Sequence, residues 1–82
     1  MQDKTDIYSI DEISDGNTKL ILDEVYDSLK EKGYDAVSQM VGYLMSGDPG
    51  YISSYQNARR KITSVDRSLI LEFLLKKGLG IK

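Results

Sequence analysis

The sequence predicts an all-α protein, a compact bundle of about four short helices that follows a flexible N-terminal tail. Apolar residues recur every three or four positions in four separate segments, which is the spacing of amphipathic helices. Glycine, proline or hydroxyl-rich turns separate these segments. Strand-like alternation is confined to one short stretch near Tyr8 and Ile10, and a lone strand without a partner is not stable. A chain of 82 residues forms one domain.

The first sixteen residues have the composition of a tail. Five of them are acidic, and Asp15, Gly16 and Asn17 together form a turn signal. We therefore divide the chain into a flexible acidic N-terminal tail, residues 1–16, and a helical domain, residues 17–82.

A first helix is expected to begin at Asn17 or Thr18, because either side chain can cap the free amides of a helix start. Its apolar positions follow helical spacing: Ile21, Leu22, Val25, Tyr26 and Leu29. Gly33 suits the left-handed residue that ends a helix.

Asp35 is the expected N-cap of a second helix. The expected apolar face of this helix consists of Val37, Met40, Val41, Leu44 and Met45. The turn at residues 46–50 ends it, since glycine terminates helices and proline removes an amide donor.

Two further helices complete the expected bundle. Ser53 or Ser54 can cap a third helix that ends at Thr63 or Ser64, and Asp66 can cap a fourth. The fourth helix carries an apolar stripe: Leu69, Ile70, Phe73 and Leu74. Its basic last turn is followed by Gly78, the expected stop.

The composition excludes several classes of function. The chain contains no cysteine and no histidine, so it has no disulfide, no thiolate metal site and no histidine base. Asp23, Glu24 and Asp27 share a helix face, but without a second cluster they are interpreted as solvated surface. The turn at residues 46–50 lacks the lysine of a phosphate-binding loop. We predict no enzyme activity, no metal and no cofactor.

The small size of the chain favours self-association. A domain this short buries a small share of its surface, and no disulfide or metal supplements the core. A homodimer is therefore expected. Core or dimer packing is assigned to a short set of residues, in which Gly42 admits close approach of another backbone: Val41, Gly42, Tyr43, Leu44 and Tyr51.

Location and charge give two further expectations. No apolar run approaches the roughly 20 residues that span a bilayer, and no signal peptide is recognisable, so a cytoplasmic protein without membrane insertion is expected. The net charge of −2 conceals an acidic first third and a basic remainder. The basic cluster consists of Arg59, Arg60 and Lys61, with Arg67 nearby. It can be a solvated face, a DNA-binding helix or a site for phosphate or the acidic tail.

The body of the chain resembles the IreB family of small regulatory phosphoproteins of Firmicutes. The resemblance covers about residues 4–77. Its most specific part is the pattern Gln-x-Val-Gly-Tyr-Leu-x-Ser-Gly-Asp-Pro at residues 39–49, supported by Lys-Gly-Tyr at residues 32–34 and Asn-Ala-Arg at residues 57–59.

The resemblance implies a helical homodimer that is phosphorylated on N-terminal threonines by a membrane Ser/Thr kinase of the PASTA type and dephosphorylated by a phosphatase. It also implies negative regulation in the cell-envelope stress response that gives cephalosporin resistance. Thr5 matches one phosphoacceptor of the family, whereas the other falls near Gln2, which cannot accept phosphate.

These expectations combine into one function. The resemblance leads us to expect a regulatory phosphoprotein that transmits a kinase signal to an unidentified downstream protein by protein–protein contact. A phosphate on Thr5 can dock on arginines such as Arg59 and Arg60. The alternative is a nucleic-acid-binding regulator that uses the basic third helix. The acidic net charge counts against it, because phosphate backbones select strongly basic faces.

Overall fold

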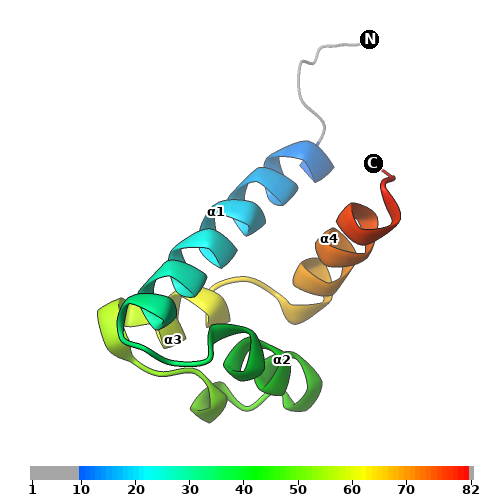
Figure 1. The fold of residues 1–82 in the computed structure, drawn as a ribbon. Coiled ribbons are helices and arrows are strands. Elements are labelled where there is room, and N and C mark those ends of the chain that lie inside the picture. Colours follow the sequence, from blue (N-terminus) through cyan, green and yellow to red (C-terminus); the bar gives the residue numbers. More distant parts are fainter. Residues whose placement is uncertain (1–9, 82) are drawn as a thin grey trace, which may run out of the picture.

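The computed structural model describes residues 10–81, and within this range all regular structure is helical. A long helix, α1 (Ile10–Glu31), forms the spine (Figure 1). Helices α2 (Ala36–Ser46) and α3 (Ala58–Thr63) lie near its C-terminal end, and α4 (Arg67–Leu79) returns towards its start. Two 3₁₀ turns, η2 (Pro49–Tyr51) and η3 (Tyr55–Asn57), join α2 to α3. The expected all-α architecture with four helices is confirmed. None of the described helices is long and apolar enough to cross a membrane.

The start of α1 differs from the expectation. The helix begins at Ile10, so the expected start at Asn17 or Thr18 is wrong. The turn signal around Gly16 does not stop the helix, because one glycine inside a helix costs only about 1 kcal/mol relative to alanine. Asp15 is held against α4 by an ion pair with Lys76 at 2.9 Å. Of the expected tail, residues 1–9 lie outside the described residues.

The ends of α1 and α2 confirm the expected glycine stops. Gly33 has a φ of +88°, and the amide of Tyr34 donates to the carbonyl of Leu29 at 2.9 Å. This is a left-handed cap that satisfies the last carbonyls of a helix. Asp35 caps α2 by accepting from the Ser38 amide at 3.1 Å, and Gly47 ends it with a φ of +78°.

The buried face of α2 agrees with the expectation only in part, since Met40 and Leu44 pack against the core but the other three expected residues do not. Ala36 and Tyr43 are buried, whereas Val37, Val41 and Met45 are exposed. Both sets follow helical spacing, so α2 carries two apolar faces and periodicity alone could not choose between them. A single chain covers one of these faces and leaves the other in solvent.

The segment before α3 also corrects the expectation. Neither Ser53 nor Ser54 caps a continuous helix: residues 55–57 form a 3₁₀ turn, and α3 begins only at Ala58. The break is caused by Gln56 and Asn57, whose φ angles are +51° and +64°. The end of α3 at Thr63 agrees with the prediction.

Helix α4 begins where expected and ends later. Asp66 accepts from the amide and the hydroxyl of Ser68 at 2.9 and 2.8 Å. The Ser68 hydroxyl, then the Ser68 amide, lower the pKa of the Asp66 carboxyl, and the nearby Arg67 charge adds to this. The expected stop at Gly78 is wrong, since the left-handed residue that ends the helix is Gly80.

The core gathers around α1. Its buried apolar residues come from all four helices and the two intervening loops: Leu22, Val25, Leu29, Ala36, Tyr43, Ile52, Ala58, Ile62, Val65, Ile70 and Phe73. Helices α3 and α4 both pack on α1, so α1 fixes the relative positions of the surfaces described next.

Candidate functional site

Residues 46–57, here called the fastened loop, connect α2 to α3 and contain much of the sequence pattern that carries the family resemblance. Side chains from neighbouring helices hold its backbone. The Gln39 side chain accepts from the Ser53 amide at 3.0 Å, and Arg59 Nε donates to the Ile52 carbonyl at 2.8 Å. The Ile52 side chain is fully buried. The loop is therefore fixed from both flanking helices.

Arg67 secures the other end of this loop. Its Nη1 donates to the carbonyl of Leu44 at 2.9 Å, near the end of α2. Its guanidinium also lies against Gly47, where a Cβ atom would approach Nη2 to 2.7 Å. The left-handed backbone at this position favours glycine, and a side chain here would also have to displace the guanidinium of Arg67.

The predicted basic cluster is therefore divided by the fold. Arg59 and Arg67 bind backbone carbonyls, and Lys61 lies 3.5 Å from Glu24 of α1. Arg60 is exposed. Because three of the four cations contact partners inside the chain, fewer of their donors are free to contact a phosphate backbone, and the nucleic-acid alternative loses support.

The turn η3 is held in an unfavourable conformation. Non-glycine residues with positive φ are uncommon, and here Gln56 and Asn57 follow one another. The buried Ser28 hydroxyl donates to Gln56 Oε1 at 2.8 Å and so fastens the turn to α1. Sequence reasoning missed this contact; the available signal was a serine on the apolar side of α1.

Tyr55 completes the attachment of this turn to α1. Its hydroxyl donates to Glu31 Oε2 at 3.1 Å, and the Lys32 ammonium lies 5.2 Å from the centre of its ring. The hydrogen bond to Glu31, followed by partial burial and the charge of Glu31, raises the pKa of Tyr55. The hydroxyl is therefore kept in its neutral, donating form.

Of the residues predicted for core or dimer packing, some are buried in the single chain and others are exposed. Tyr43 is buried, Leu44 is half-buried, and Val41 keeps 47% of its surface exposed. Gly42 faces the ring of Tyr51, so closely that an added Cβ atom would overlap the ring. The close approach predicted at Gly42 is thus filled by a side chain of the same molecule, and Tyr51 still exposes half of its surface.

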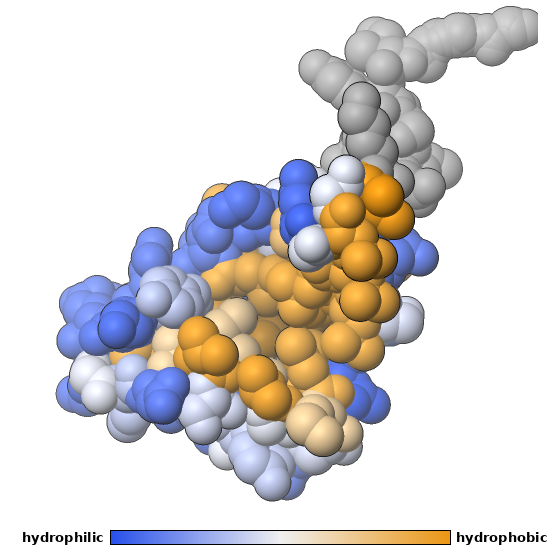
Figure 2. Space-filling model, turned by 45° about the vertical axis from the view of Figure 1, so that its right-hand side comes forward, coloured by the Kyte–Doolittle hydropathy of each residue, from blue (hydrophilic) through white to orange (hydrophobic). Residues whose placement is uncertain are grey.

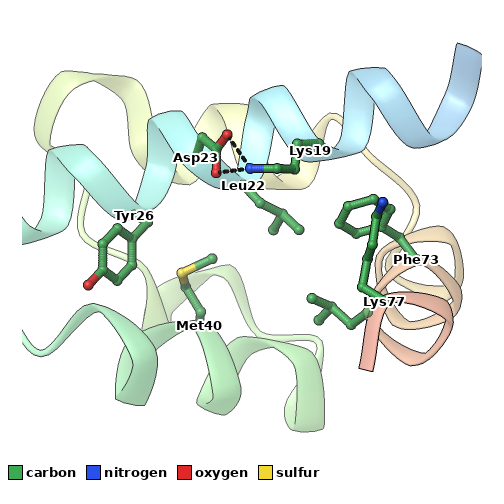
Figure 3. Close-up of a pocket in the computed structure, with 8 residues that line it drawn as sticks. Lys19, Leu22, Asp23, Tyr26, Met40, Phe73 and Lys77 are labelled. Carbon is green, nitrogen blue, oxygen red and sulfur yellow. Dashed lines mark hydrogen bonds and ion pairs between the residues drawn. The ribbon is translucent and has the colours of Figure 1, made fainter. Parts of the chain in front are cut away.

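A groove of about 420 Å³ opens between α1, α2 and α4 (Figure 3). Its lining is mostly apolar and is contributed by all three helices: Lys19, Leu22, Asp23, Tyr26, Met40, Phe73, Leu74 and Lys77. Its charged groups come from α1 and α4 (Figure 3). Lys19 Nζ bridges both carboxylate oxygens of Asp23, at 2.9 and 2.7 Å, and the Lys77 ammonium lies 5.6 Å from the Phe73 ring centre.

Exposed apolar side chains extend the groove into a wide surface, here called the apolar face (Figure 2). The face comprises the apolar groove residues and the exposed apolar residues that follow them around α2 and α4: Val37, Val41, Met45, Leu71 and Leu75. Met45 is 83% exposed. Adjoining exposed apolar side chains of this kind are typical of an interaction site.

Two of the acidic residues singled out on α1 have cationic neighbours. Asp23 pairs with Lys19, and Glu24 lies beside Lys61. Within residues 10–81, His, Cys, Asp and Glu side chains do not gather in any group of three that could hold a metal ion. Thr5, the predicted phosphoacceptor, lies outside the described residues.

Comparison with known protein families gives one match over nearly the whole chain. Residues 3–80 match the model of the family described as IreB regulatory phosphoprotein. The match includes α1, the fastened loop, the apolar face and the segment that carries Thr5.

Proposed function

Because the chain belongs to the IreB family of regulatory phosphoproteins, we propose that it is a non-enzymatic cytoplasmic regulator that passes on a kinase signal by protein–protein contact. The apolar face is the observation that carries this proposal. It offers a partner a wide apolar surface but no cluster of reactive groups, which suits recognition rather than catalysis.

Thr5 is the proposed phosphoacceptor. The family description supports phosphorylation. The resemblance assigns the phosphate to an N-terminal threonine, to which a PASTA-type Ser/Thr kinase adds it and from which a phosphatase removes it. The proposed output is negative regulation of the cell-envelope stress response and of cephalosporin resistance, through a downstream protein that this chain binds.

A homodimer is the proposed form of the protein, with the apolar face as its interface. The apolar residues of α4 are spread around the helix rather than gathered on one side, so packing on a single neighbour leaves some of them exposed. In a single chain it packs on α1 and leaves Leu71, Leu74 and Leu75 exposed. A two-fold axis through this face would cover the same residues on both copies, as isologous dimers do.

The phosphorylation is tested by intact-mass spectrometry after incubation with a PASTA-type kinase domain. We expect one phosphate on the wild type and none on Thr5→Ala. Ser9→Ala, which removes a neighbouring hydroxyl, is the matched control and should keep the phosphate. An unmodified wild type, or a phosphate that survives Thr5→Ala, would disprove the assignment.

A further inference from the structure

One side chain of the apolar face differs from its aliphatic neighbours in its chemistry. Met45 exposes 83% of its surface, more than any other large apolar residue in the described part of the chain. Its thioether sulfur is soft and polarisable, and peroxides oxidise it, whereas they leave the hydrocarbon side chains of Val41 and Leu75 unchanged. At this position the surface of the protein can therefore be altered chemically.

Met45 lies within the apolar face rather than beside it. It follows Val41 by four residues, and Val41 follows Val37 by four, so the three side chains share one side of α2. All three are exposed. A chemical change at Met45 is thus a change within the surface that we assign to partner contact.

Met40 belongs to the same helix but is placed differently. Its side chain projects from α2 towards α1, lines the groove and packs against the core (Figure 3). It is only partly exposed. The two methionines therefore offer a comparison within one helix, in which the residue type is constant and the access of solvent differs.

We propose that Met45 is a site of reversible oxidation by hydrogen peroxide, and that its sulfoxide weakens the contact made through the apolar face. The choice of residue follows from the exposure of its side chain. The effect on association rests on the proposed homodimer. Met1, the third methionine of the sequence, lies outside the described residues.

The oxidation transfers one oxygen atom to sulfur. A sulfur lone pair attacks one oxygen of hydrogen peroxide, and a sulfur–oxygen bond forms while the oxygen–oxygen bond breaks. The second oxygen leaves as water with both peroxide protons. The sulfur loses two electrons and the peroxide gains them. Methionine sulfoxide reductases reverse the change, with two thiols as the reductant that leave as a disulfide and water.

The composition directs this chemistry to methionine. Thiolates are the usual side-chain targets of peroxides, and the chain contains no cysteine. Of the two described methionines, only Met45 is exposed. Peroxide should therefore modify Met45 before Met40.

The sulfoxide changes the contact because its oxygen is polar. Burying a polar group without a hydrogen-bond donor is unfavourable, and the neighbours of Met45 on this side of α2 are the apolar Val37 and Val41. In an isologous dimer both copies bring the same residue to the interface, so both carry the oxygen. We expect the dissociation constant of the dimer to rise about tenfold or more. Peroxide reaches the sulfur in the single chains that are in equilibrium with the dimer.

Peptide mass mapping of the full chain during treatment with hydrogen peroxide tests the site. The chain is diluted until sedimentation shows single chains, so that pairing does not shield either methionine. We expect Met45 to gain one oxygen several times faster than Met40. Equal rates, or faster oxidation of Met40, would overturn the assignment.

Sedimentation over a dilution series, before and after peroxide, tests the effect on association. The dissociation constant of the wild type should rise on oxidation and return after treatment with a sulfoxide reductase. Met45→Leu removes the sulfur and keeps a similar volume, so its dissociation constant, whatever its starting value, should not respond to peroxide. Met40→Leu keeps the exposed sulfur and should respond as the wild type does. Circular dichroism of the oxidised chain checks that the helices are retained.

Two results would overturn the effect on association. One is a dissociation constant that stays unchanged although Met45 is fully oxidised, and the other is a response to peroxide that persists in Met45→Leu. A wild type that is a single chain before any treatment would contradict the proposed homodimer and this effect together. The order in which Met45 and Met40 are oxidised would still decide whether Met45 is the site.

Discussion

The fastened loop and the apolar face lie on the same small molecule, but only the loop has its groups bound by other parts of the chain. Backbone groups of the loop are bound by side chains of the flanking helices, as with Arg59 on Ile52 and Gln39 on Ser53. The apolar face leaves large side chains such as Val41 and Met45 in solvent. The loop backbone therefore finds its hydrogen-bond partners within one chain, whereas the apolar face leaves its side chains exposed.

This difference has a cause in α2. One side of the helix packs Ala36 and Tyr43 into the core, and a neighbouring side carries the exposed residues of the apolar face. Arg67, the first residue of α4, holds the end of α2 through the Leu44 carbonyl and so helps to set the direction in which the exposed side points. One side of α2 therefore stabilises the fold, and we propose the other side for recognition.

The largest expected effect concerns the core beneath the fastened loop. Ile62→Ala should lower the free energy of unfolding by about 2–5 kcal/mol, because the fully buried side chain leaves a cavity. Urea denaturation measures this change. Ile62→Val, the matched control, should cost only about 0.5–1.5 kcal/mol. Equal costs for the two variants would contradict tight packing at this position.

The next effect concerns the arginine that secures α2. Arg67→Met should lower the free energy of unfolding by about 1.5–3 kcal/mol, since it removes a charged hydrogen bond to the Leu44 carbonyl. Arg60→Met makes the same substitution at an exposed position and should change the free energy of unfolding by no more than about 0.5 kcal/mol. Thermal or urea unfolding of the pair would show whether the two arginines differ as the structure requires.

A smaller effect is expected at the strained turn. Ser28→Ala removes the donor to Gln56 and should cost about 0.5–1.5 kcal/mol, the usual net value of such a hydrogen bond. Hydrogen exchange should increase in residues 55–57 and remain unchanged in α4. Unchanged exchange at this turn would mean that Ser28 does not hold it.

The smallest effects come from titration. The pKa of Asp66 is lowered in the folded chain, so its contribution to stability is present above the ordinary aspartate pKa and is lost as the pH falls through the folded value. Asp66→Asn should flatten this part of the acid stability profile.

Tyr55 should act in the opposite sense at high pH. Its raised pKa means that its contribution is complete below the ordinary tyrosine pKa and is lost as the pH rises through the folded value. Tyr55→Phe should remove this alkaline dependence, which unfolding measured between neutral and alkaline pH would detect. A profile identical to that of the wild type would exclude the contact with Glu31 as its cause.

Local signals in the sequence were sufficient for most of the fold. Asp35 and Asp66 cap their helices as predicted, and Gly33 and Gly47 end theirs, because these residues act through their own backbone or the next few amides. The signals at Gly16 and Gly78 were misleading, since glycine is tolerated within a helix that packs on a neighbour.

The candidate site was less accessible to sequence reasoning. Charge counting grouped Arg59, Arg60 and Arg67, but the fold uses two of them to bind backbone carbonyls before α3. Helical periodicity identified Val37 and Val41 as apolar without indicating that they face outward. Such assignments depend on tertiary partners, which the spacing of residues within one helix does not reveal.

Sedimentation of the full chain, compared with a variant that carries Val41→Lys and Leu75→Lys, tests most directly whether the apolar face is the contact surface. Both residues are exposed in the single chain, so the variant should keep its helical content. The wild type should sediment at twice the chain mass of 9.2 kDa and the variant at the mass of one chain. A wild type that stays at the mass of one chain, or a variant that remains a dimer, would contradict the assignment.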